Sequence, residues 1–137
     1  MDYSNSLDLV HNNNGHDDVV HSSGLRGYVE VMQQLGIDAM PLLAKHGIKQ
    51  VQLQDDNEWI SHYAVIQLLE ESAQQAHCAD LGLRISHYQD ISILGVLGSI
   101  LQSASTLRDV LKYSSDLLFL HGSAPRLYFN EHVTTDL

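Results

Sequence analysis

The chain has 137 residues and a net charge of −10, because seventeen Asp and Glu outweigh seven Lys and Arg. This length suits one domain, and the seven basic residues are scattered, so we expect no direct binding to DNA or RNA. No apolar run approaches the roughly 18–20 residues that span a bilayer, and the first residues lack a secretory signal. Cys78 is the only cysteine and so cannot form an internal disulfide. The sequence therefore indicates a cytoplasmic protein with no membrane partner.

Residues 1–23 are expected to be a flexible leader, because they are polar and show no sustained helix or strand period. Order is expected from Gly24, so that deleting the leader should leave the melting temperature nearly unchanged. The leader holds the best local cluster of metal-ligand residue types, His11, His16 and His21 with Asp17 and Asp18. Their spacing matches no common zinc site. We therefore predict a polar tail and expect neither a metal nor a cofactor.

From Leu25, apolar residues spaced by three and four predict a helix to Leu35, which Gly36 ends. Pro41 suits the first turn of a short second helix, which Gly47 closes. Residues 48–54 alternate weakly between apolar and polar side chains. This pattern is typical of a short edge strand or an extended connector.

The strongest helix is predicted from Ser61, its N-cap, to His77, and a short helix follows over residues 80–86. Residues 93–101, which Ser92 can cap, are apolar almost all round, so we expect that helix to be central and buried.

Gly95 and Gly98 interrupt this apolar helix, where each costs about 1 kcal/mol relative to alanine. We favour the interpretation that they let a neighbouring helix approach closely. A ligand passing near the bare backbone is the alternative.

Thr106-Leu107-Arg108-Asp109 has capping-box spacing and opens a helix that should end near Gly122. Pro125 breaks the chain, and residues 126–133 are typical of a strand. The fold class is therefore mainly α: a compact multi-helix domain over residues 24–137, with one or two short strands. The last strand would belong to an incomplete α/β unit, because one strand forms no stable sheet.

The sequence offers little for catalysis, because no nucleophile elbow, phosphate-binding loop or dinucleotide fingerprint occurs. Cys78 is adjacent to His77, but neighbours on a helix point about 100° apart and cannot easily form a hydrogen-bonded Cys–His pair. Cys78 is instead predicted to be a small core or interface residue. We expect no enzyme. A small-molecule pocket leaves little sequence signature, and its candidate residues are the aromatic side chains Trp59, Tyr63 and Tyr113. Packing in a partly buried position is the alternative for each of the three.

The order and spacing of many short pieces resemble the arabinose-binding-like amino-terminal domain of AraC-type transcriptional regulators, over roughly residues 24–133. The pieces are Leu25-Arg26-Gly27-Tyr28, Leu35-Gly36-Ile37-Asp38, Leu42-Leu43, Gly47-Ile48, Trp59-Ile60, Leu68-Leu69-Glu70, Ala73, Asp80-Leu81-Gly82-Leu83-Arg84, Leu94-Gly95, Ala104-Ser105-Thr106-Leu107-Arg108, His121 and Leu127-Tyr128-Phe129.

This resemblance implies the regulatory part of a transcription factor that senses a small effector, forms a homodimer, or both. DNA and RNA polymerase would be contacted through a helix-turn-helix part that is expected to be absent from this chain. The family name is no evidence for arabinose, since no set of sugar-binding residues stands out. A helical oligomerisation module without a ligand is the second hypothesis, and an unrecognised enzyme is the third.

Overall fold

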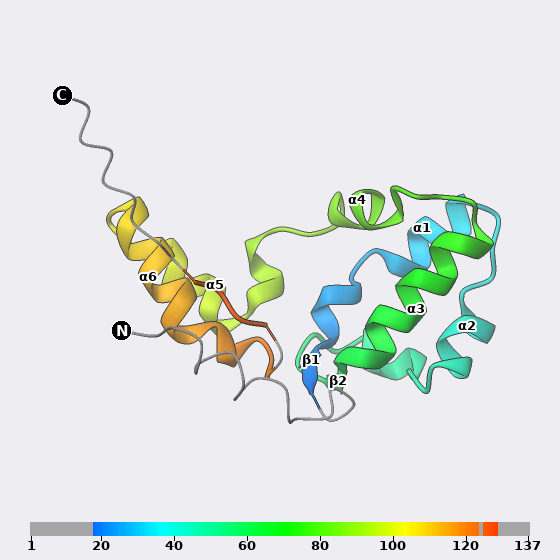
Figure 1. Cartoon of the computed structure of the whole chain (residues 1–137), viewed down its shortest axis with the longest axis horizontal. Helices are drawn as coiled ribbons and strands as arrows, with labels where there is room; N and C mark the ends of the chain where they lie inside the picture. The colour runs from blue at the N-terminus through cyan, green and yellow to red at the C-terminus, as the bar shows by residue number, and fades with distance from the viewer. Residues whose placement is uncertain (1–17, 124, 129–137) are drawn as a thin grey trace, which may run out of the picture.

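The computed structural model describes residues 18–123 and 125–128 (Figure 1). Its α-helices are α1 (Tyr28–Gln34), α2 (Met40–Lys45), α3 (His62–Gln75), α4 (Leu81–Ser86), α5 (Val96–Gln102) and α6 (Leu107–Leu117). Short 3-10 helices are η2 (Ser22–Leu25), η3 (Gln50–Leu53), η4 (Ile91–Leu94) and η5 (Leu118–Leu120), and the strands are β1 (Val19–His21) and β2 (Trp59–Ser61). The predicted mainly α class is confirmed. None of the described helices has the length and apolar character needed to cross a membrane.

Figure 1 shows α1 to α4 gathered at one end of the molecule and α5 and α6 at the other, with β1 and β2 between them. The main core lies in the first group, where Tyr28, Met32, Leu43, Leu68 and Leu81 are at most 1% exposed. The Tyr28 hydroxyl lies 2.8 Å from the Ser72 hydroxyl, so this core satisfies its buried polar groups. Burial raises the pKa of Tyr28, which therefore stays neutral.

The helices of this group begin and end where local chemistry predicts. Gly36 and Gly47 adopt left-handed backbone angles, φ +76° and +70°, just after α1 and α2. The Ser61 side chain accepts a hydrogen bond from the Ala64 amide at 3.2 Å and caps α3 as expected. Cys78 is 6% exposed and belongs to the core, as predicted.

The expectation that order begins near Gly24 is wrong for residues 18–23. β1 pairs antiparallel with β2, in the register Val19↔Ser61, Val20↔Ile60 and His21↔Trp59. A strand of three residues is too short to show a period, and its partner lies some forty residues further along the chain. Residues 1–17, including His11, His16 and Asp17, lie outside the described residues.

Residues 48–54 contain the 3-10 helix η3, and neither the edge strand nor the extended connector that the sequence suggests. The Lys49 amide donates to the Gln52 side chain at 2.8 Å, and the Gln52 amide donates to the Lys49 carbonyl at 2.9 Å. This local pair of bonds closes a tight turn. The weak alternation of side chains in the sequence carried no information about such a turn.

The prediction of one continuous central helix over residues 93–101 is also wrong. Gly95, with φ +56° and ψ −128°, separates η4 from α5, and Asp90 caps η4 in place of Ser92. Val96 is 69% exposed, and only Leu97, Gly98 and Leu101 of α5 are buried. Gly98 does allow another segment to approach closely, but that segment is the preceding turn and not a neighbouring helix. An added Cβ would lie 2.4 Å from the Ile91 carbonyl oxygen.

The start of α6 is as predicted, since the Asp109 amide donates to the Thr106 hydroxyl oxygen at 3.1 Å. The helix ends at Leu117 and continues as η5, short of the expected end near Gly122. Residues 126–128 form no strand, and residues 129–133 of the expected strand lie outside the described residues.

Candidate functional site

The strand β1 joins the two helical groups, because residues 121–123 bond to it on the side away from β2. The His21 amide donates to the His121 carbonyl at 3.1 Å, and the Ser123 amide donates to the Val19 carbonyl at 2.9 Å. The Val19 amide in turn donates to the Ser123 hydroxyl oxygen at 2.9 Å, and an isolated bridge pairs Val20 with Gly122. Residues 18–23 therefore connect the group of α1 to α4 with the segment that follows α6.

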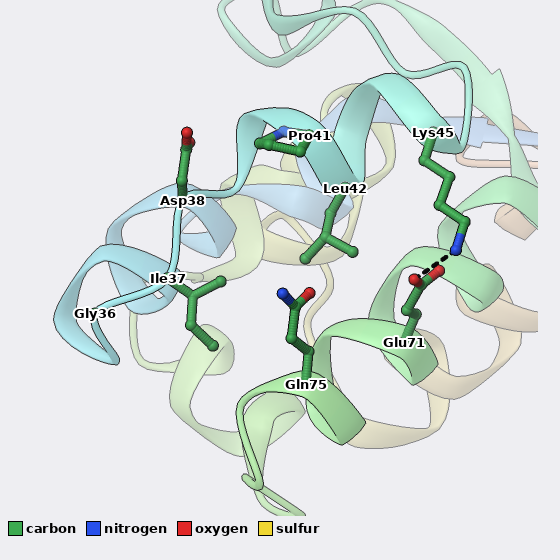
Figure 2. Close-up of a pocket in the computed structure, with 8 residues that line it drawn as sticks. All are labelled: Gly36, Ile37, Asp38, Pro41, Leu42, Lys45, Glu71 and Gln75. Carbon is green, nitrogen blue, oxygen red and sulfur yellow. Dashed lines mark hydrogen bonds and ion pairs between the residues drawn. The ribbon is translucent and has the colours of Figure 1, made fainter.

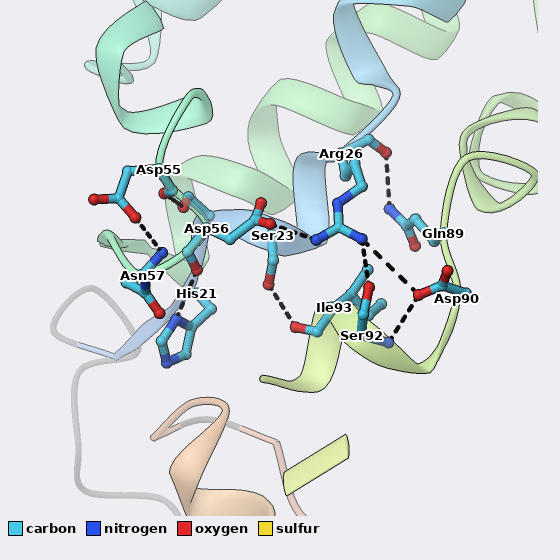
Figure 3. A network of polar contacts seen from close by, with 11 residues as sticks. His21, Ser23, Arg26, Asp55, Asp56, Asn57, Gln89, Asp90, Ser92 and Ile93 are labelled. Carbon is cyan, nitrogen blue, oxygen red and sulfur yellow. Dashed lines mark hydrogen bonds and ion pairs between the residues drawn. The ribbon is translucent and has the colours of Figure 1, made fainter. Parts of the chain in front are cut away.

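Arg26 makes the second connection between these groups (Figure 3). Its guanidinium donates to the Ser92 hydroxyl at 2.8 Å, forms an ion pair with Asp56 and lies 4.0 Å from the Asp90 carboxylate. We call Arg26, Asp56, Asp90 and Ser92 the Arg26 clasp. Each contact is partly exposed and stabilises little by itself, but together they fix η4 beside the turn before β2.

Side-chain bonds to backbone carbonyls reinforce the clasp. The Ser23 hydroxyl, on a residue only 2% exposed, donates to the Ile93 carbonyl at 2.6 Å. The Gln89 amide donates to the carbonyls of Gly24 and Arg26 at 2.9 and 3.1 Å. The position of η4, and hence of α5, is therefore set by polar contacts to η2.

A partly open cavity of about 170 Å³, the junction pocket, lies beside this clasp. Residues from both sides of the junction line it: His21, Asp56, Asn57, Ser92, Ile93, Leu94, Gly95, Val96 and Leu120. One wall is polar and comes from β1, the turn before β2 and the start of η4. The other is apolar and comes from η4, α5 and η5.

The polar wall offers both a hydrogen-bond acceptor and a donor. The His21 Nδ1 atom lies 3.0 Å from the Asp56 carbonyl, which can only accept, so Nδ1 carries the hydrogen. In the neutral ring the Nε2 atom is then an acceptor. The Ser92 oxygen accepts from Arg26, and its own hydroxyl hydrogen is left to donate.

Two further rings pack around His21. The Trp59 ring lies 4.0 Å from it, and the His121 ring stacks on it at 5.8 Å with an interplanar angle of 15°. Burial, and then the nearby His21, lower the pKa of His121, so this ring is neutral at pH 7. The buried Nδ1 atom of His121 has no hydrogen-bond partner among the described residues.

The aromatic residues predicted from the sequence do not gather around one pocket. Trp59 lies in β2 and Tyr63 in the first turn of α3, 46% and 43% exposed, and Tyr113 is half-buried in α6. None of them lines the junction pocket, although Trp59 contacts His21, which does. Their roles as ligand contacts stay predictions. Sequence reasoning missed Arg26 and considered His21 only as a metal ligand in the leader, because the partners of both lie 30 or more residues away.

A second pocket of about 470 Å³ lies between α3 and residues 36–45 (Figure 2). Ile37, Leu42 and Gln75 face it, and the ion pair of Lys45 with Glu71, at 2.6 Å, closes one end. Lys45, and then His46 at 2.8 Å, lower the pKa of Glu71. Every residue that lines this pocket lies between the end of α1 and the end of α3, within the group of α1 to α4. A ligand here would therefore not contact α5 or α6.

In the described part of the chain, no group of three or more His, Cys, Asp or Glu side chains is placed so that it could hold a metal ion. Cys78 donates to the Asp80 carboxylate at 3.1 Å, and this bond, with burial, raises the pKa of the thiol. The thiol is thus protonated at pH 7 and is a poor nucleophile.

Comparison with known proteins decides the family. Residues 36–136 match the family described as the arabinose-binding domain of AraC transcription regulators, N-terminal. The chain belongs to this family.

Among curated relatives of this arabinose-binding domain, the HTH-type transcriptional regulator VirS of Mycobacterium tuberculosis is 30% identical to it over 106 residues. The same identity holds for VirS of strains CDC 1551 and H37Rv. The alignment covers 77% of this chain and 31% of VirS, so the chain spans about a third of these relatives. The resemblance read from the sequence is confirmed, and the domain family is one of transcriptional regulators and not an enzyme class.

Proposed function

We propose that this arabinose-binding-type domain senses a small effector at the junction pocket and thereby controls transcription. The observation that carries the proposal is the position of the pocket, which takes its walls from both sides of the Arg26 clasp. A ligand there contacts β1 and the turn before β2 on one side and η4, α5 and η5 on the other. It therefore stabilises the arrangement in which both sides are together.

The mechanism is a population shift. An effector changes an equilibrium only by as much as its affinity differs between the two states. A compound in the junction pocket makes its full set of contacts only when the clasp is closed, whereas one in the pocket of Figure 2 contacts the α1–α3 group alone. The junction pocket is for this reason the better effector site. In a full-length regulator, this shift in the population of the two states would change the activity of an attached DNA-binding part, which contacts DNA and RNA polymerase in the cytoplasm.

A thermal-shift screen of metabolites tests the proposal. An effector present at about 100 times its Kd is expected to stabilise the chain by about 2.7 kcal/mol. Leu94→Trp, which fills the junction pocket, should abolish this stabilisation, and Gln75→Trp, which fills the pocket of Figure 2, should leave it intact. Stabilisation that survives Leu94→Trp and is lost in Gln75→Trp would place the effector in the other pocket.

The alternative is an oligomerisation module with no small-molecule ligand, which self-associates through exposed apolar side chains. Val96, Leu107, Phe119 and Tyr128 are each more than 60% exposed. Such side chains on and after α5 offer surface to a second copy. A concentration-dependent dimer in sedimentation velocity, together with no stabilising compound, would favour this alternative. An effector-responsive homodimer would show both behaviours.

The chain itself should not retard duplex DNA in a mobility-shift assay at about 150 mM salt, because it cannot release the counterions that drive such binding. Three of its seven basic side chains, Arg26, Lys45 and Arg84, already face carboxylates. Tight binding that weakens steeply with salt would contradict this expectation.

A further inference from the structure

We infer that the ligand of the junction pocket is a small uncharged compound with an apolar body and a single hydroxyl group, a benzyl-alcohol-like molecule in size and polarity. The inference rests on the proposed function, since it names the chemical class for the same site. Three properties of the pocket support it: its volume, its charge and the hydrogen-bonding groups of its polar wall.

The volume suits a ligand of roughly one ring. A cavity of about 150 Å³ lined by apolar side chains holds benzene, and the junction pocket has about 170 Å³. Sugars with several hydroxyl groups would need a polar partner for each, whereas Ile93, Leu94, Val96 and Leu120 make one whole wall apolar.

The charges around the pocket disfavour an ion of either sign. No lysine or arginine lines the pocket, so an anion would lose its hydration without gaining a partner. The one carboxylate among the lining residues, Asp56, is already paired with Arg26. Because Arg26 already pairs with that carboxylate, a cation would gain less from it than from an unpaired one.

The polar wall matches a hydroxyl group. In its neutral form the His21 ring offers Nε2 as an acceptor, and the Ser92 hydroxyl has a hydrogen left to donate. A ligand hydroxyl donates one hydrogen bond and accepts others, so it carries both the donor that Nε2 needs and the acceptor that the Ser92 hydroxyl needs. Neither a hydrocarbon nor an ether can do so.

Trp59, the only tryptophan of the chain, is a built-in reporter, because its ring lies 4.0 Å from the His21 ring. We would titrate the whole chain with benzyl alcohol, toluene, benzoate and benzylamine, following Trp59 fluorescence and, in parallel, amide chemical shifts by NMR. These four probes have similar size and differ in charge and hydrogen bonding. Benzyl alcohol is expected to bind at least tenfold more tightly than either ion.

The variant His21→Phe separates the hydrogen bond from the shape of the pocket. It keeps an aromatic ring beside Trp59 but loses the Nε2 acceptor, so benzyl alcohol should bind several-fold more weakly while toluene binds as before. Ser92→Ala should act in the same direction through the loss of the donor. Leu94→Trp should abolish binding of both probes.

Each contrary outcome has a distinct meaning. Tighter binding of benzoate or benzylamine, still abolished by Leu94→Trp, would overturn the ligand class and leave the proposed effector site in place. Benzyl alcohol binding that Leu94→Trp does not change would overturn the inference, because the probe would be bound elsewhere. No binding of any of the four probes would overturn it as well, and the metabolite screen would then test the proposed function by itself.

Discussion

Deleting residues 1–23 will destabilise the chain by on the order of 5 kcal/mol relative to a chain that lacks only residues 1–17. The longer deletion removes Val20, which is 8% exposed, and the hydroxyl groups of Ser22 and Ser23, each on a residue 2% exposed. The Ser22 hydroxyl donates to the Asp55 carbonyl, and the Ser23 hydroxyl to the Ile93 carbonyl, both at 2.6 Å. The strand that joins β2 to residues 121–123 is lost with them.

Denaturant unfolding of the two truncated chains, followed by circular dichroism and Trp59 fluorescence, measures this difference. A loss of about 5 kcal/mol is comparable with the whole stability of many small domains, so the longer deletion should leave much of the chain unfolded. Equal midpoints for both deletions would contradict the account, and would support the leader that the sequence suggested.

Gly98→Ala will lower the free energy of unfolding by about 1–3 kcal/mol, although the same change in an exposed helix usually raises it. The new Cβ would lie 2.4 Å from the Ile91 carbonyl oxygen and 3.5 Å from the Leu94 Cβ, so η4 would have to move away from α5. Because η4 carries Ser92 and Ile93, the Arg26 clasp would be displaced with it.

Gly82→Ala is the matched control, since Gly82 also lies within a helix, α4, and nothing lies within 4 Å of its added Cβ. This change should stabilise by up to about 1 kcal/mol. The two variants are therefore expected to shift the unfolding midpoint in opposite directions. A stabilised Gly98→Ala variant would show that η4 does not pack against α5 as closely as the structure has it.

Elements whose signals are local could be predicted from the sequence. The helix that ends before Gly36, the Ser61 cap and the Thr106 cap each depend on signals within a few positions of one another, and they are confirmed, although the first helix begins at Tyr28 and not at Leu25. The Asp109 side chain accepts from the Thr106 hydroxyl, so the second half of the predicted capping box is not formed. The resemblance to a known domain family added the biological context that composition and periodicity could not supply.

Elements that depend on distant partners could not be predicted. β1 is a strand because β2 and residues 121–123 pair with it, and those partners are some 40 and 100 positions away. The same holds for the candidate site, where Arg26 meets Asp56 and Ser92 across 30 and 66 positions. The sequence places His21 in a leader because residues 1–23 show no sustained helix or strand period, and nothing local indicates that Trp59 and His121 pack against its ring.

Exposure along an apolar segment was equally hard to predict. Residues 93–101 are apolar on nearly every side, which suggested a central helix. The turn at Gly95 instead leaves Val96 exposed and turns Leu97 and Leu101 inward. Whether such a segment is covered depends on packing partners, which the sequence pattern does not specify.

Hydrogen exchange of the whole chain, with and without a saturating effector from the metabolite screen, tests the central claim most directly. Peptides that contain residues 18–26, 55–61, 90–98 and 118–123 should exchange more slowly when the effector is bound, because these segments meet at the junction pocket. Peptides that cover residues 36–45 and 71–75 should be unchanged. Protection confined to residues 36–45 and 71–75, with none at the junction, would contradict the claim that the junction senses the effector.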